Sequence, residues 1–104
     1  MNYEDRLKHT KELFDECLKT MESKSQDYAS KLDAHANFKE GADLIGLTKY
    51  QVWAVYFFKH IKAILRALQR NPATPESITE PIRGRIIDTI VYLSIFACML
   101  IEDK

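Results

Sequence analysis

The sequence predicts an all-α fold in which three long helices and one short helix pack as a helical bundle, completed by oligomerisation. Apolar residues recur at three- and four-residue spacings along three long segments, which is the period of an amphipathic helix. No segment alternates apolar and polar residues as a half-buried strand does. The chain has 104 residues, 46% hydrophobic and 29% charged, a globular balance with room for one domain over residues 1–104.

The first long helix is predicted over residues 2–28. Its apolar side chains recur on one face while charged side chains fill the others: Tyr3, Leu7, Phe14, Cys17, Leu18 and Met21. Residues 29–37 are small and polar, so we expect a connector there. A short helix over residues 38–45 is expected to end at Gly46, because glycine readily adopts the left-handed conformation of a helix end.

The second long helix is predicted to start after Thr48, whose hydroxyl is a suitable N-cap, and to end at Arg70 before Asn71-Pro72. Its apolar stripe is predicted as Trp53, Phe57, Ile61, Ile64, Leu65 and Leu68. The last helix is capped by Ser77 or Thr79, has Pro81 in its first turn and reaches Glu102.

The last helix is apolar on nearly every side beyond Arg85, so it needs neighbours all round. Three long helices cannot surround one of their own number, and a homo-oligomer is therefore predicted. Its most apolar run, residues 90–101, is 12 residues long, whereas a membrane span needs roughly 18–20, so we expect no membrane partner. Cys17 and Cys98 lie within apolar patterns and are expected to be packed thiols, and no export signal opens the chain, which favours the cytoplasm.

Charge is distributed unevenly along a chain whose net charge is zero. The zero total argues against bulk binding of nucleic acid, so we expect no DNA or RNA duplex as a partner. Between Leu44 and Pro75 there is no Asp or Glu, but there are five cations: Lys49, Lys59, Lys62, Arg66 and Arg70.

Four of these cations, Lys59, Lys62, Arg66 and Arg70, are three, four and four residues apart and so share one helix face, which continues toward Tyr56. Cations beside an aromatic ring suit a phosphate with a stacked base. A solvated helix face is the other interpretation, and the lack of acidic neighbours favours the binding site. Arg83 and Arg85 add two cations near the start of the last helix.

Asp88 lies within the apolar last helix, one turn before Tyr92, and a buried carboxylate needs a partner. Arg85, Lys59 and Arg66 are candidates for an ion pair, which is the commoner arrangement, and a hydrated metal is the alternative. The chain's three histidines lack zinc-ligand spacing. The acidic pairs Glu12 with Glu16 and Glu40 with Asp43 form no four-carboxylate cage, so no metal or other cofactor is predicted.

Taken in order, several short motifs resemble the small phage proteins grouped as nucleotide-modification-associated domains, which are distantly similar to the all-α MazG-type nucleotide pyrophosphohydrolases. The resemblance covers roughly residues 22–99. Its motifs are Asp27-Tyr28, Asn37-Phe38, the helix with Lys59, Lys62 and Arg66, Glu76-Ser77, and Asp88 followed by Tyr92. The chain departs from the family at Ala29, where glycine is usual, and in lacking the paired acidic motifs that bind magnesium in MazG-type enzymes.

A protein with the cationic nucleotide pocket that the resemblance implies, but without the metal cage, is expected to bind a nucleotide without cutting it. In size, helicity and predicted oligomerisation, rather than in any motif, the chain is also similar to the phage sponges that capture cyclic nucleotide immune signals in the cytoplasm of the infected bacterial host. The predicted ligand-binding residues are Lys59, Lys62, Arg66, Arg70, Arg83 and Arg85 for phosphate, Tyr28, Trp53 and Tyr56 against the base, and Asn37 and Asp88 beside them. On this interpretation, changing Arg66 to Ala weakens capture strongly.

Two other functions stay open at this point. One is a magnesium-dependent nucleotide pyrophosphohydrolase or nucleotide-modification enzyme that gathers its ion with Asp27, Asp88 and acids of the first or short helix. The other is an interaction module whose apolar last helix docks a protein partner. Incubation with nucleotides distinguishes the three functions. Ligand recovered intact favours capture, products that depend on magnesium favour the enzyme, and no retained ligand favours the interaction module.

Overall fold

The computed structural model describes residues 1–28, 33–76 and 81–104. For residues 25–28 it describes the backbone only. Within these ranges the chain forms helices and no strand: α1 (Tyr3–Tyr28), α2 (Ala36–Ile45), α3 (Lys49–Arg70) and α4 (Ile82–Glu102). The all-α fold predicted from the periodicity is therefore confirmed, as are three long helices and a short one.

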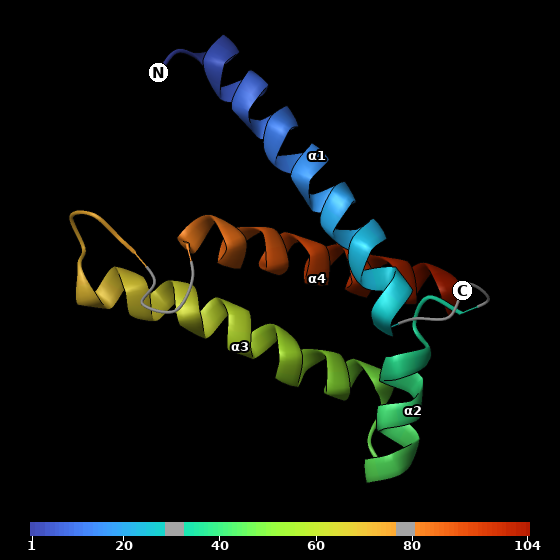
Figure 1. The fold of residues 1–104 in the computed structure, drawn as a ribbon. Helices are drawn as coiled ribbons and strands as arrows, with labels where there is room; N and C mark the ends of the chain where they lie inside the picture. The colour runs from blue at the N-terminus through green and yellow to red at the C-terminus, as the bar shows by residue number, and fades with distance from the viewer. Residues whose placement is uncertain (29–32, 77–80) are drawn as a thin grey trace.

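The helices are arranged around an antiparallel pair made by α3 and α4 (Figure 1). Tyr50 at the start of α3 contacts the end of α4, and His60 in the middle of α3 lies near Asp88. The second half of α1 crosses α4, while α2 packs on the first turns of α3. The first half of α1 projects away from the other three helices (Figure 1).

Local signals in the sequence fix where α2 ends and α3 begins. Gly46 has a φ of 71°, the left-handed conformation expected of it, which lets the chain leave α2 without Cβ strain. Thr48 and Gln51 form a capping box, in which each side chain accepts a hydrogen bond from the other's backbone N–H. At its other end α2 begins at Ala36, two residues earlier than predicted. The predicted caps Ser77 and Thr79 lie outside the described residues, and Pro81 directly precedes α4.

The core lies where α2, α3 and α4 meet. It is built from the buried side chains of Phe38, Ala42, Val52, Trp53 and Met99. The Trp53 ring stacks on Phe57, with centroids 4.8 Å apart, and its indole N–H donates a 2.7 Å hydrogen bond to the carbonyl of Tyr92. Buried tryptophan usually has such an acceptor. The bond ties α3 to α4 at the centre of the pair.

Burial on α3 and at the cysteines differs in part from the prediction. Leu65 and Leu68 are 52% and 46% exposed, because α3 instead turns His60 and Ala67 inward. The apolar stripe was therefore placed correctly only in its first half. Cys17 is buried as expected, and burial raises the pKa of its thiol, whereas Cys98 is exposed.

Helix α4 is apolar but poorly covered. Only Thr89, Val91 and Met99 are fully buried on it, while Leu93, Leu100 and Ile101 are 49%, 46% and 67% exposed. By length and composition alone, α4 is the one helix in the described ranges that meets the requirements of a membrane span. The sequence analysis, which considered only the 12-residue apolar run at residues 90–101, did not predict that α4 would meet this length and composition. A single helix of this kind is weak evidence for a membrane, because the core helix of a soluble protein can have the same length and composition.

Candidate functional site

A cavity of about 610 Å³ lies where α1, α2, α3 and α4 come together. Its volume falls within the roughly 300–1,000 Å³ typical of small-molecule sites. Apolar side chains make up much of its wall, and the polar side chains that line it are Lys24, His35, Asn37, Tyr56, Lys59, His60, Tyr92 and Ser94. Among the described residues, no Asp or Glu lines the cavity. An apolar wall with a few convergent polar groups is typical of a ligand site.

Three residues predicted for the site from sequence line this cavity together: Asn37 from α2 and Tyr56 and Lys59 from α3. Tyr56 is 49% exposed, and its ring meets Phe38 edge-on at 6.1 Å between centroids. The Lys59 ammonium forms no ion pair with any carboxylate whose side chain the structure describes. The cavity is therefore bordered by an exposed lysine that has no carboxylate partner among the described side chains.

Asp88 lies beside the cavity and is engaged by its neighbours. Its carboxylate pairs with the Lys24 ammonium at 3.0 Å and lies 3.7 Å from Nδ1 of His60, and its side chain is only 16% exposed. The sequence predicted an ion pair and offered Arg85, Lys59 and Arg66 as partners. The kind of interaction is confirmed, but the partner is Lys24 of α1, 64 residues away.

His60 is buried at the cavity wall with Nδ1 lacking a hydrogen bond to any described residue. Burial holds the pKa of His60 below its ordinary value, Asp88 opposes this shift, and Lys24, Arg85 and Lys59 reinforce it. The imidazole is therefore neutral at neutral pH. The charged groups that act on this ring are therefore of both signs.

The remaining predicted cations do not converge on the cavity. Lys62 lies over the ring of Phe58 at 5.5 Å, Arg66 is exposed, and Arg70 donates a 2.8 Å hydrogen bond to the backbone carbonyl of Glu76. Arg83 is paired with Glu16 of α1 at 2.8 Å, and Arg85 is half-buried outside the cavity lining. Of the four cations predicted to share this face of α3, only the exposed Lys59 borders the cavity.

Two further aromatic residues, Trp53 and Tyr28, were predicted to lie against the base. Trp53 belongs to the core, where Phe57 and Phe96 cover its ring, so the structure removes it from the predicted site. Its N–H already donates to the carbonyl of Tyr92, and its ring already packs between two aromatic rings inside the α3–α4 pair. Neither is therefore available to a base. The side chain of Tyr28 lies outside the described residues, as do those of Asp27 and Ser77.

The acidic pairs considered for magnesium also lie away from the cavity. Glu16 is held by Arg83 and Glu12 lies 3.5 Å from His9, while Glu40 and Asp43 are exposed on α2. Magnesium sites need several oxygen ligands focused on one ion. The described residues provide no such focus at the cavity.

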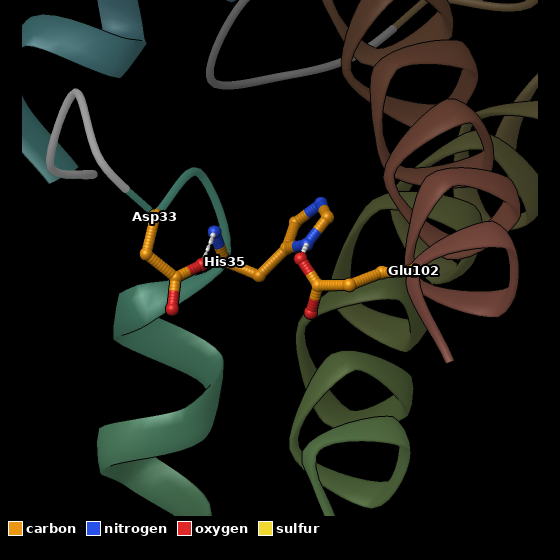
Figure 2. A group of neighbouring side chains, drawn as sticks. All are labelled: Asp33, His35 and Glu102. Carbon is orange, nitrogen blue, oxygen red and sulfur yellow. Dashed lines mark hydrogen bonds and ion pairs between the residues drawn. The ribbon is translucent and has the colours of Figure 1, made fainter. Parts of the chain in front are cut away.

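A second polar cluster joins the loop before α2 to the end of α4 (Figure 2). Nδ1 of His35 lies 3.3 Å from Glu102, and the Asp33 carboxylate accepts a hydrogen bond from the His35 backbone N–H at 3.0 Å. One potential metal-ligating atom from each of these residues lies within 4.8 Å of the others. However, the Lys39 ammonium bonds Asp33 at 3.0 Å and Glu102 at 2.7 Å, so a side chain already supplies the positive charge.

The same end of α4 is held by a second group of contacts, from α3. Lys49 pairs with Asp103 at 2.6 Å, and the Tyr50 hydroxyl donates to the same carboxylate. We call Asp33, His35, Lys39, Lys49, Tyr50, Glu102 and Asp103 the C-terminal clasp. Sequence analysis missed it because its members are separated by up to about 70 residues and carry no spacing signal.

The C-terminal clasp predicts a loss of stability in acid. Hydrogen bonds from Lys39 hold the pKa values of Asp33 and Glu102 below their ordinary 3.8 and 4.5, and Lys49 does the same for the pKa of Asp103. The unfolded chain therefore takes up protons first as the pH falls. The stabilisation is complete above about pH 4.5 and disappears as the pH falls through the lowered pKa values.

Melting temperature measured by circular dichroism over this pH range tests the clasp. The double variant Glu102→Gln/Asp103→Asn is expected to melt at a lower temperature than the natural chain near neutral pH and to lose less on acidification. Curves that stay parallel for the two proteins would show that the clasp contributes nothing to the acid response.

Some of the motif residues that carry the resemblance to phage nucleotide-modification-associated proteins meet at the cavity, whereas Lys62 and Arg66 do not. Asn37, Phe38, Lys59 and Tyr92 line the cavity and Asp88 lies beside it. No protein-family model, curated protein or solved structure matches the chain. The resemblance therefore stays a prediction that rests on these residues.

Proposed function

We propose that the chain captures a phosphorylated small molecule, a nucleotide or cyclic nucleotide, in the inter-helical cavity and does not cleave it. The observation that carries the proposal is the Lys59 ammonium, which lines the cavity without a described carboxylate partner and beside the neutral ring of His60. An ammonium group left unneutralised next to an apolar wall favours an anionic ligand.

In this proposal each polar side chain has a separate task. Lys59 supplies a point charge to the phosphate, and the ring of His60 forms part of the cavity wall next to it. Asn37 can pair with the edge of a base, because an amide both donates and accepts. The half-exposed ring of Tyr56 offers a face for stacking.

Capture is favoured over hydrolysis by the chemistry of the cavity wall. Magnesium-assisted cleavage of a polyphosphate needs carboxylates directed at the ion, and the described lining has none. Asp88, beside this wall, is held by Lys24 at 3.0 Å. Asp33 and Glu102, which contact the lining residue His35, are both held by Lys39. The described acids next to the wall are therefore already paired with lysines.

Recovery of the ligand tests the proposal. The purified protein is incubated with nucleoside triphosphates or cyclic dinucleotides, with and without magnesium, washed, denatured by heat, and the released compound identified by mass spectrometry. Intact ligand in both conditions is expected. Cleaved products that appear only with magnesium would overturn capture in favour of an enzyme. If the protein retains none of the compounds, the proposed nucleotide site is wrong.

A further inference from the structure

The chain exposes two apolar rows that no described residue of its own covers. One follows α1, where Tyr3, Leu7, Phe14 and Leu18 are between 44% and 65% exposed. The other follows α4 through Leu93, Leu100 and Ile101, which are between 46% and 67% exposed. We call these seven side chains the free apolar surface. We propose that it binds a second copy of this chain.

The row on α1 has the spacing of a helix–helix contact. Tyr3, Leu7, Thr10, Phe14, Cys17 and Met21 follow one another at alternating steps of four and three residues. This is the heptad pattern with which one helix packs along another. In the single chain α4 covers only the later part, since Cys17 is buried and Met21 meets Ser94, while Phe14 and Leu18 stay exposed. The heptad pattern on α1 therefore extends beyond the part of α1 that packs on α4.

The first half of α1 also lacks support from the rest of the chain. The hydrogen bonds, ion pairs and ring contacts of residues 1–15 are all local, such as Asn2 with Asp5 and His9 with Glu12. Figure 1 shows this half projecting from the other helices. Helices shorter than about 12–15 residues are marginal in water without packing. The projecting half therefore gains no stabilisation from packing within the single chain, and a partner surface would supply it.

The size of the molecule gives the area that a partner must cover. The radius of gyration is 15.7 Å, compared with about 13 Å for a compact chain of about 100 residues. The accessible surface is 7810 Å² at a mass of 12.1 kDa, about 1,800 Å² more than a folded monomer of that mass exposes. Obligate homodimers bury about 1,000–2,500 Å² per subunit. The excess area thus falls within the range that a permanent dimer buries per subunit.

A second copy fits this surface better than a membrane does. The exposed row on α1 lies on a helix whose other faces carry charges of both signs, and the chain itself supplies a matching apolar helix for it. In the first half of α4, Arg83 is paired with Glu16 and Asp88 with Lys24, so insertion would carry ion pairs into lipid. A net charge of zero also leaves no overall repulsion between copies.

The mass in solution tests this surface. Light scattering after size exclusion is expected to give at least twice 12.1 kDa for the natural chain. The variant Leu7→Glu/Phe14→Glu is expected to give 12.1 kDa, while the matched control Leu44→Glu, at an 86% exposed position on α2, keeps the larger mass. A monomeric natural chain, or dissociation by the control alone, overturns the proposal. Flotation of the natural chain with neutral phosphatidylcholine vesicles overturns it in favour of a membrane.

Cross-linking decides the matter if the double variant fails to fold. In a mixture of heavy-isotope and unlabelled natural chains, an amine-reactive reagent is expected to join copies through Lys8 or Lys11 of α1. Links between copies only through Lys39 or Lys62 overturn the proposal. The test is independent of the proposed ligand, because none of the free apolar surface lines the cavity.

Discussion

Replacing Lys59 with methionine is expected to weaken binding of the captured nucleotide by about tenfold to a hundredfold, the range for losing one hydrogen bond to a charged group. Methionine keeps the length and the apolar stem of the side chain while removing the ammonium that lines the cavity. Because Lys59 forms no described ion pair, the variant leaves no carboxylate unpaired and is expected to fold normally. Titration calorimetry with the recovered ligand measures the change.

Arg66→Met is the matched control for this change. Arg66 is a cation two turns further along the same face of α3, but it is exposed and does not line the cavity. Its loss is therefore expected to alter affinity by less than about threefold, which reverses the expectation drawn from sequence for this residue. An equal loss in the two variants would show that the whole cationic face, rather than the cavity, holds the ligand.

The second large effect is expected from Trp53→Ala, which should lower the free energy of unfolding by about 3–5 kcal/mol. The indole is 8% exposed and lies between Phe57 and Phe96, with ring centroids 4.8 and 4.7 Å away. Its removal leaves a cavity in the core and breaks the hydrogen bond to the carbonyl of Tyr92. Urea denaturation followed by circular dichroism gives the free energy.

Trp53→Phe separates packing from hydrogen bonding. Phenylalanine keeps a ring between the two aromatic neighbours and removes only the N–H donor to Tyr92, so a loss of about 1 kcal/mol is expected. If the two variants lose equal stability, packing of the indole does not hold α3 against α4. Unchanged ligand affinity in Trp53→Phe is also expected, because the ring is inside the core and not at the cavity.

The sequence predicted the helices well because their limits are set by neighbouring residues. The left-handed Gly46 and the N-cap Thr48 act within one turn of chain, and both were found where expected, while the capping-box partner Gln51 was not predicted. Burial was harder to predict, since it depends on the direction from which another helix approaches. Leu65 and Leu68 continue the apolar period of α3, yet α4 meets the side that carries Ala67.

The site was predictable only in part, for the same reason. Spacing placed Lys59 and Arg66 on one face, but nothing local indicated that only the first of them borders the cavity. Partners far apart in sequence, such as Lys24 with Asp88, carry no periodic signal. Trp53 shows a different limit: an aromatic residue on a helix is equally suited to a core and to stacking on a base.

Because the chain has one tryptophan, the hydrogen bond from Trp53 to the carbonyl of Tyr92 gives the protein a built-in optical reporter. Tyr92 lines the cavity on its other side, so a molecule entering there sits one residue away from the indole. The emission of this fluorophore depends on the polarity around its ring and on its N–H bond. Tryptophan fluorescence is therefore expected to report both occupancy of the cavity and separation of α3 from α4, without any attached dye.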